Sequence, residues 1–167
     1  MNRPPSPGGI RWPARYDPAV TPVHVRNELS MNAPAPQVWR WLLRAPLWPQ
    51  WYPNSRHVVQ LSGGWPDLSL HTRFRWTTFG VRIVSEVLEY EPGERLAWDA
   101  KGIGVDAYHA WWLQPTPLGC VVLTEETQYG FAARLGALVF PTRMFRYHQL
   151  WLERLAAQAA AGDPPND

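Results

Sequence analysis

The sequence predicts an α+β domain in which one curved antiparallel sheet of seven strands wraps around a long C-terminal helix. Three observations lead to this prediction. Segments with the alternating polarity of strands recur between residues 23 and 129, short turns separate the last six of them, and one long amphipathic segment follows. Short links favour antiparallel pairing because parallel strands need long crossover connections.

The first strand is expected at residues 23–31, where apolar and polar side chains alternate. Two short helices should follow it. Pro34 suits a first helical turn, and the apolar residues after it have helical spacing: Val38, Trp39, Leu42 and Leu43. A second, very short helical turn is expected around residues 47–51, ending at Pro53.

Six further strands complete the predicted sheet. They are expected near residues 57–61, 72–77, 81–90, 95–101, 105–114 and 121–129. Turn-forming Gly and Pro residues stand between them, for example at Gly63-Gly64 and Pro92-Gly93. This order predicts a meander of neighbouring strands.

The last element is expected to be a helix over residues 134–161. Its apolar face carries Met144, His148, Trp151, Leu152 and Leu155. Pro141 lies inside this segment and lacks a backbone donor, so the helix should kink or break near its start.

Domain boundaries follow from composition. Residues 1–21 are rich in Pro and predict an extended tail, pinned to the body by Trp12 and Tyr16. Residues 22–161 should form one domain, and residues 162–167 should stop the last helix and fray. The one Cys excludes a disulfide framework, and neither a signal peptide nor a long apolar run is recognisable, so a cytoplasmic protein without membrane insertion is expected.

Charge and aromatic content narrow the function classes. The net charge is +2 and the basic residues are scattered, which argues against nucleic acid as a partner. Arg is strongly preferred over Lys, a usage typical of GC-rich bacterial genomes. The chain has 11 Trp, and such aromatic content favours a small-molecule pocket, although a Trp-filled core is the alternative.

Two strands and the last helix supply the candidate acid–base groups. In residues 105–114 the odd positions are more apolar, so His109 should face inward. In residues 121–129 the even positions are more polar, which puts Glu126 in water and Glu125 on the enclosed face. A three-residue loop at Pro117–Gly119 supports this, because it would place odd opposite odd residues. The predicted catalytic group is His109, Glu125, Tyr129 and His148. Purely structural hydrogen bonding of these side chains remains the alternative.

Several motifs occur in an order that resembles a known family. They are Pro34-Ala35-Pro36-Gln37-Val38-Trp39, Trp48-Pro49-Gln50-Trp51-Tyr52-Pro53, Val87-Leu88-Glu89-Tyr90-Glu91-Pro92, His109-Ala110-Trp111-Trp112-Leu113-Gln114-Pro115 and Thr124-Glu125-Glu126-Thr127-Gln128-Tyr129-Gly130. Over residues 22–160 the chain resembles the SRPBCC superfamily, in particular its polyketide cyclase/dehydrase branch. The resemblance implies the helix-grip fold, with a hydrophobic cavity between the sheet and the C-terminal helix.

Three functions are compatible with this resemblance. The first is binding of a lipid-, quinone- or polyketide-like molecule in a cavity lined by Phe74, Trp76, Trp111, Leu113, Leu123, Met144, His148 and Trp151. The second is a cyclase or dehydratase in which His109 or His148 removes a proton, Glu125 assists, and Tyr129 donates to the enolate oxygen. The third is an interaction module whose outer face presents Tyr108, Trp112 and Arg82.

No cofactor is implied by any of these functions. The five His show no zinc-type spacing, so no metal is expected. The segment Phe131–Phe140 could touch a membrane, but the favoured interpretation places it at the cavity rim or in the first turns of the last helix. The expected partner is therefore a hydrophobic small molecule, bound by a monomer or a homodimer.

Overall fold

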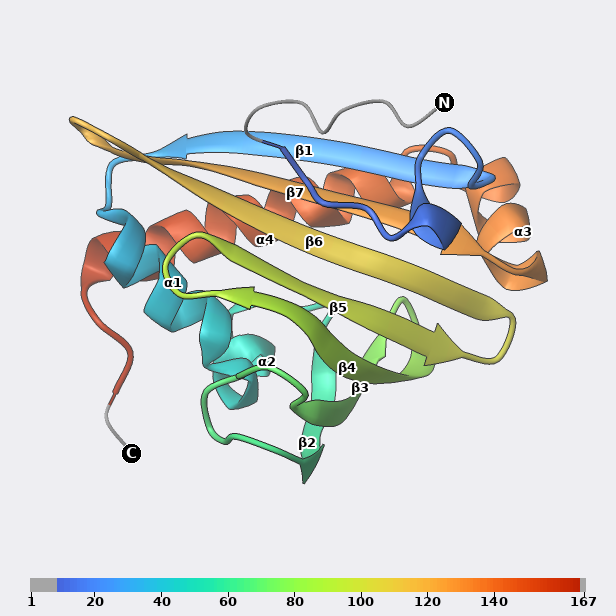
Figure 1. The fold of residues 1–167 in the computed structure, drawn as a ribbon, viewed down its shortest axis with the longest axis horizontal. Helices are drawn as coiled ribbons and strands as arrows, with labels where there is room; N and C mark the ends of the chain where they lie inside the picture. The colour runs from blue at the N-terminus through green and yellow to red at the C-terminus, as the bar shows by residue number, and fades with distance from the viewer. Residues whose placement is uncertain (1–8, 166–167) are drawn as a thin grey trace.

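A computed structural model describes residues 9–165 and shows one antiparallel sheet that curves around a long helix (Figure 1). The sheet has seven strands in the order β1-β7-β6-β5-β4-β3-β2. Strands β2 to β7 therefore form a meander, and β1 pairs with β7. The strands are β1 Val23–Met31, β2 Arg56–Ser62, β3 Arg73–Thr78, β4 Val81–Glu91, β5 Arg95–Gly102, β6 Val105–Thr116 and β7 Gly119–Tyr129. The predicted fold class is confirmed.

Two short helices follow β1, as expected. They are α1 Ala35–Leu43 and α2 Trp48–Trp51, joined by a turn of 3₁₀ helix at Ala45–Leu47. Pro residues stand near the start of each, where a missing N–H costs no hydrogen bond. In Figure 1, α1 lies at the left beside the C-terminal part of α4, and α2 lies below it, near β2.

The C-terminal helix is divided at Pro141, as the sequence predicts. A short helix, α3, spans Phe131–Val139, and the long helix α4 spans Arg143–Ala161. The break follows from the absence of an N–H on Pro141. Helix α4 runs along the concave face of the sheet, whereas α3 projects at its end (Figure 1).

The main core lies between the concave face of the sheet and helices α1, α2 and α4. Its largest fully buried side chains are Trp48, Trp98, Trp111 and Trp151. Trp48 contacts the rings of Trp98 and Trp151, with centroids 5.6 and 5.3 Å apart. Much of the unusual Trp content therefore packs in this one cluster.

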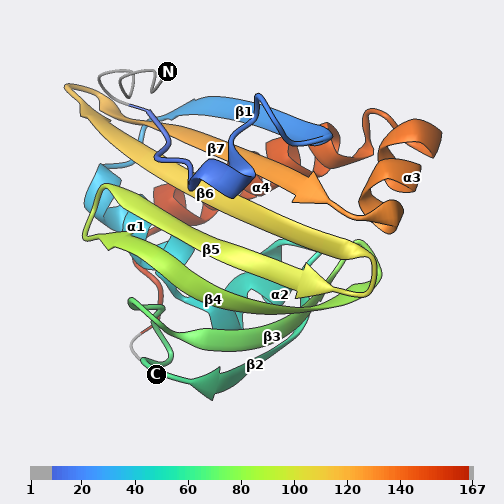
Figure 2. The same ribbon diagram turned by 45° about the vertical axis from the view of Figure 1, so that its right-hand side comes forward.

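A second, smaller core lies on the convex face, beneath the N-terminal segment (Figure 2). Residues 9–21 cross this face and include one turn of 3₁₀ helix at Ala14–Tyr16. Tyr16 stacks on Tyr108 at 5.4 Å and donates a hydrogen bond to Asp106. Tyr108 is thus 2 % exposed, so the expectation that it forms part of an open outer patch is wrong.

The register between β6 and β7 differs from the expected one. Thr116 pairs with Gly119, so the loop has two residues rather than three, and odd positions lie opposite even ones. His109 is the partner of Glu126, not of Glu125 or Thr127. Because neighbouring residues of a strand point to opposite faces, Glu126 faces inward and Glu125 outward.

The described residues contain no helix that is long and apolar enough to cross a membrane. The predicted N-terminal and C-terminal tails extend beyond the described range at residues 1–8 and 166–167. Among the described residues of the N-terminal segment, Trp12 and Tyr16 both contact Tyr108 on the sheet.

Candidate functional site

A cavity of about 340 Å³ lies between the sheet, α3 and α4. Such a volume is at the lower end of the range for small-molecule pockets. The strands contribute Trp76, Ile83, Trp98, His109 and Glu126; α3 and the turn after it contribute Ala133, Gly136, Ala137 and Phe140; α4 contributes Met144, His148 and Trp151. Most of these side chains are apolar or aromatic.

The two ends of the cavity differ in exposure. Gly136, Phe140 and Arg143 are not buried, so the end beneath α3 is open to solvent. His109, Glu126 and His148 are all buried, and so are the rings of Trp98 and Trp151 beside them. A ligand that enters near α3 would therefore meet the polar groups at the buried end.

Three side chains from three elements meet at this buried end. His109 lies on β6, Glu126 on β7 and His148 on α4. The Glu126 Oε2 atom lies 3.3 Å from His109 Nδ1 and 3.1 Å from His148 Nε2. The two imidazole planes are nearly parallel, at 11°, with centroids 4.8 Å apart.

Neighbouring side chains orient this His–Glu–His cluster. Thr124 Oγ1 lies 2.8 Å from His109 Nε2, and the Gln128 side chain donates to Glu126 Oε1. The Thr124 hydroxyl in turn donates a hydrogen bond to the Ala110 carbonyl oxygen, at 3.2 Å. Glu126 is in this way placed between ring nitrogens of His109 and His148 and accepts a hydrogen bond from Gln128.

Burial and charge set the protonation states of the cluster. Burial lowers the pKa of His109 to about 3, so its imidazole is neutral at pH 7. Burial alone would raise the pKa of Glu126, but the hydrogen bond from His148, together with His109 and Gln128, lowers it below its usual value. The cavity thus ends at one carboxylate ion next to a neutral imidazole.

Several buried polar atoms near the cavity have no hydrogen-bond partner among residues 9–165. They are the indole Nε1 atoms of Trp98, Trp111 and Trp151, and Nδ1 of His148. Buried polar groups without partners are uncommon in folded proteins and call for an explanation at each position. The indoles are donors, and His148 Nδ1 is an acceptor when Nε2 carries the proton.

Most of the residues predicted to bind the ligand lie between the concave face of the sheet and α4. Trp76, Met144, His148 and Trp151 line the cavity. Phe74, Trp111 and Leu113 are buried in the surrounding core but do not line it. His109, predicted as a catalytic residue, is also a lining residue.

Three predicted residues lie on the other face of the sheet, which corrects their expected placement in the cavity. Leu123, Glu125 and Tyr129 share the outward side of β7, because the two-residue loop reverses the expected parity. Tyr129 donates a hydrogen bond to the Arg15 carbonyl of the N-terminal segment. None of the three lines the cavity.

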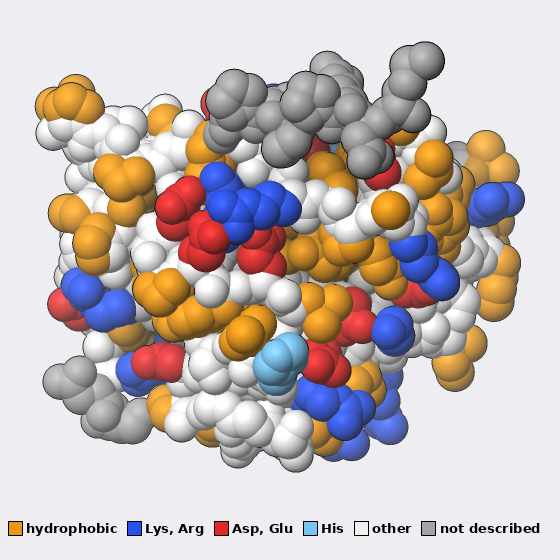
Figure 3. Space-filling model, viewed as in Figure 1, with side chains coloured by type: hydrophobic (Ala, Val, Ile, Leu, Met, Phe, Trp, Pro, Cys, Tyr) orange, Lys and Arg blue, Asp and Glu red, His pale blue; other side chains and the backbone are white. Residues whose placement is uncertain are grey.

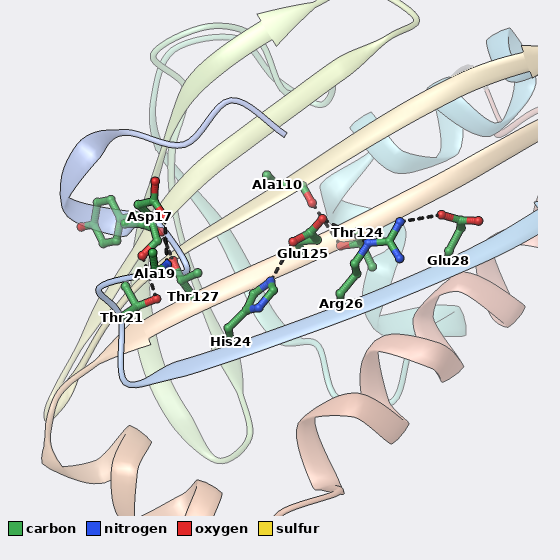
Figure 4. Close-up of polar contacts among 11 residues, drawn as sticks. Asp17, Ala19, Thr21, His24, Arg26, Glu28, Ala110, Thr124, Glu125 and Thr127 are labelled. Atoms are coloured by element: carbon green, nitrogen blue, oxygen red, sulfur yellow. Dashed lines mark hydrogen bonds and ion pairs between the residues drawn. The ribbon is translucent and has the colours of Figure 1, made fainter. Parts of the chain in front are cut away.

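Glu125 has its own partners on the convex face (Figure 4). The close-up shows His24 pointing toward Glu125 from β1, with Nε2 2.7 Å from Oε2. Arg26 lies beside the same carboxylate, with its Nε 3.4 Å from Oε1. Glu125 is therefore paired outside the cavity and has no contact with the His–Glu–His cluster.

Glu126, Trp98 and Tyr52 are lining residues that the sequence pattern did not reveal. The sequence predicts Glu126 in water, because the even positions of this strand are the more polar ones and a three-residue loop agrees with that choice. The signal that could have located it is the two-residue loop Pro117-Leu118, since a Thr116–Gly119 pair changes the parity of the whole strand. Tyr52 stacks on Trp151 at 4.4 Å, a contact that no periodicity predicts.

Among the described residues, the His–Glu–His cluster is also the group of side chains that could hold a metal ion. One ligand atom each from His109, Glu126 and His148 lie within 4.8 Å of one another. Two imidazoles and a carboxylate suit Zn²⁺ or Fe²⁺. Without an ion, the Glu126 carboxylate contacts the two ring nitrogens directly, at 3.3 and 3.1 Å.

Comparisons with known proteins agree with this architecture. The family model described as "Polyketide cyclase / dehydrase and lipid transport" matches residues 22–160. A crystal structure of the hypothetical protein jhp0584 from Helicobacter pylori is similar, with a TM-score of 0.85 and 31% identity, covering 92% of this chain and 98% of that one. A search of curated proteins found no match.

More distant structures share the fold. The di-domain ARO/CYC StfQ of the steffimycin biosynthetic pathway has a TM-score of 0.68 at 16% identity, covering 83% of this chain and 51% of that one. Norcoclaurine synthase from Thalictrum flavum, in complex with dopamine and hydroxybenzaldehyde, has a TM-score of 0.65 at 14% identity, covering 86% and 89% of the two chains. At these identities the likeness establishes the helix-grip fold alone.

Proposed function

The chain belongs to the polyketide cyclase/dehydrase and lipid transport family, and we propose that its cavity binds one mainly apolar small molecule with a polar group at one end. The observation that carries this proposal is the division of the cavity into an apolar, aromatic wall and one buried polar end. Apolar walls supply affinity, while a few fixed polar groups set the orientation of the ligand.

The wall and the cluster together favour a flat molecule with a carbonyl or hydroxyl group. Trp76, Trp98 and Trp151 line the cavity, and the rings of Trp76 and Trp98 both pack against Trp151. Aromatic rings prefer stacked or edge-on neighbours, which an aromatic ligand provides. Lipid-, quinone- and polyketide-like compounds have this combination of an apolar body and an oxygen at one end. Aromatic molecules are also bound by the distantly similar norcoclaurine synthase.

Probe binding tests this proposal. We would titrate emodin, menadione and oleic acid, which represent aromatic polyketides, quinones and lipids, and follow the quenching of Trp fluorescence. At least one probe should bind with one-to-one stoichiometry. Absence of saturable binding for all three would contradict the proposal.

Two adjacent carboxylates provide a matched pair of variants for the same titration. Glu126→Gln removes the charge that His109 and His148 face, and we expect about tenfold weaker binding, in line with the loss of one charge-assisted hydrogen bond. Glu125→Gln changes only the convex face, so its affinity should equal that of the wild type. Equal effects of the two substitutions would show that the cluster does not contact the ligand.

A second candidate function is acid–base catalysis on a carbonyl compound. It is favoured by one observation, the pairing of His148 Nε2 with an ionised carboxylate while Nδ1 has no partner in the described range. In such a pair the carboxylate stabilises the imidazolium that forms when the free nitrogen takes up a proton. His148 would then remove a proton from the carbon next to a carbonyl, and the electron pair would move onto the carbonyl oxygen.

Proton exchange distinguishes catalysis from binding. We would follow exchange of the central methylene protons of benzoylacetone in D₂O by NMR. Catalysis predicts a faster exchange that is lost in His148→Ala and kept in His71→Ala, since His71 lies at the surface. An exchange rate that the wild type does not increase would leave binding as the function.

A further inference from the structure

An exposed apolar surface lies at the open end of the cavity, on α3 and the first turn of α4. Its members are Phe131, Leu135, Leu138, Val139, Phe140 and Phe145, all between 49% and 80% exposed. We call these six residues the α3 patch. Orange side chains gather at the right-hand edge of Figure 3, where Figure 1 places α3.

Helix α3 is apolar on both sides, which the fold alone does not require. Ala133 is its one buried residue, and Ala132, Ala133, Gly136 and Ala137 line the cavity. The opposite side carries the large residues of the α3 patch and faces solvent. A helix that covers a cavity needs only one apolar side, so the outer side remains to be explained.

The charged residues of α3 and of the first turns of α4 are all basic. Residues 127–152 contain Arg134, Arg143 and Arg146 and neither Asp nor Glu. All three Arg are exposed, and Arg143 lies over the ring of Phe140 at 5.7 Å. Asp106, on the nearby end of β6, is already bound by Arg15 and Tyr16. The patch is therefore a set of apolar side chains surrounded by positive charge.

We infer that the α3 patch docks on an anionic lipid membrane, with its apolar side chains in the interface and the three Arg at the lipid headgroups. A surface element that presents large apolar residues flanked by Arg has the composition of an interfacial anchor. Each Arg near an anionic surface adds attraction, and long Arg side chains reach the headgroups while apolar residues lie deeper.

Docking in this orientation would place the open end of the cavity against the membrane. Two residues that line the cavity belong to this region: Phe140 is a member of the α3 patch, and Gly136 lies on helix α3. An apolar ligand could then pass between bilayer and cavity without crossing water. This consequence rests on the proposed ligand binding, whereas the docking itself does not.

Vesicle sedimentation tests the inference. The full chain would be mixed with vesicles of equal parts phosphatidylglycerol and phosphatidylcholine, or of phosphatidylcholine alone. We expect binding to the anionic vesicles, weaker binding to the neutral ones, and loss of the difference at high salt. Failure of the wild type to bind anionic vesicles would overturn the inference.

A matched pair of Leu variants locates the contact. Leu138 and Leu118 are 80% and 84% exposed, but Leu118 lies in the β6–β7 loop at the other end of the sheet. Leu138→Ser should weaken vesicle binding about tenfold, whereas Leu118→Ser should leave it unchanged. Arg134→Gln should reduce binding to anionic vesicles about fivefold and have no effect with neutral ones. Equal behaviour of the two Leu variants would contradict docking through α3.

Two controls separate membrane docking from a damaged cavity and from self-association. Emodin titration of Leu138→Ser without vesicles reports whether the cavity is intact, so that failure of docking and failure of ligand binding are distinguished. Size-exclusion chromatography reports whether the α3 patch instead joins two copies of the chain. A wild-type dimer that Leu138→Ser converts to a monomer, without vesicle binding by either, would overturn the inference.

Discussion

Glu126 is the side chain that gives the buried end of the cavity its charge. A buried carboxylate is costly unless it has hydrogen-bond donors, and here His148 and Gln128 provide them, while His109 Nδ1 lies 3.3 Å away. The same three contacts hold two imidazoles in fixed positions beside the aromatic wall. The cluster is thus at once a structural feature of the sheet–helix contact and the polar group that a ligand would meet.

Acidification should destabilise the fold through His109. Its pKa is about 3 in the folded protein, whereas an unfolded chain has the ordinary value near 6.5. Between these values the unfolded state binds more protons, so stability falls as the pH falls below about 6.5. This group should cost about 2 kcal/mol between pH 7 and pH 5, measured as the free energy of unfolding in urea.

A pair of His variants isolates this effect. His109→Asn should flatten the decline of stability between pH 7 and pH 5, while His71→Asn, at a surface position, should retain it. The pKa of Glu126 is lowered in the fold, so its contribution is lost only below the ordinary Glu range and lies outside this window. An unchanged slope in His109→Asn would show that His109 is not the buried neutral group.

At the residue scale the sequence predicted the two His of the cluster but chose the wrong carboxylate. The odd positions of β7 are the more apolar ones, so periodicity favoured Glu125 as the inward carboxylate, and a three-residue loop agreed with that choice. The structure reverses it, because the loop has two residues and the more polar set faces inward. A change of one residue exchanges every side chain between the two faces of a strand.

Helix α3 is positioned by the turn that precedes it. Gly130 has φ 108° and ψ 161°, a conformation essentially restricted to glycine. A Cβ atom there would lie 2.1 Å from the Gly104 carbonyl oxygen, and that oxygen accepts a hydrogen bond from Ala132 N–H. The close approach of these two turns fixes where α3 leaves the sheet.

Substitution by Ala should change the free energy of unfolding in opposite directions at Gly130, in the turn before α3, and at Gly136, within α3. Gly130→Ala should lower the free energy of unfolding by about 1–3 kcal/mol through backbone strain and the clash with Gly104. Gly136→Ala has no atom within 4 Å of the new Cβ and should raise stability by about 0.5–1 kcal/mol. Urea unfolding measures both changes, and a stabilised Gly130→Ala would contradict the described turn.

At the element scale the sequence predicted the helices and strands well, because each has its own periodicity and ends at Gly or Pro. The break at Pro141 was expected from the chemistry of proline. The orientation of α3 was not predictable, since an apolar segment reads as buried whether it packs on a core or faces solvent. Only the tertiary structure separates its cavity-lining side from the α3 patch.

The whole molecule consists of a sheet covered on both faces. Helices α1, α2 and α4 cover the concave face, and the N-terminal segment covers part of the convex one. Thr127 donates to the Tyr16 carbonyl, and Arg95 donates to the Gly9 carbonyl, so side chains of the sheet hold this segment in place. The second layer removes Tyr108 and Ala110 from water.

The overall architecture followed from the short links between strands and the long final helix. The cavity did not follow from periodicity, because its volume depends on how α3, α4 and the sheet pack together. Its expectation came from the family resemblance. The N-terminal segment was expected to be pinned by Trp12 and Tyr16, but the extent to which it covers Tyr108 could not be read from a Pro-rich composition.

Native mass spectrometry of cavity-blocking variants tests most directly whether a ligand occupies the space between the sheet and the helices. Ala137 lines the cavity, whereas its neighbour Leu138 faces solvent, so Ala137→Trp should fill the opening and Leu138→Trp should not. With the probe that binds the wild type, a one-to-one complex should persist in Leu138→Trp and disappear in Ala137→Trp. A complex that forms equally in both variants would place the ligand elsewhere and contradict the proposed cavity.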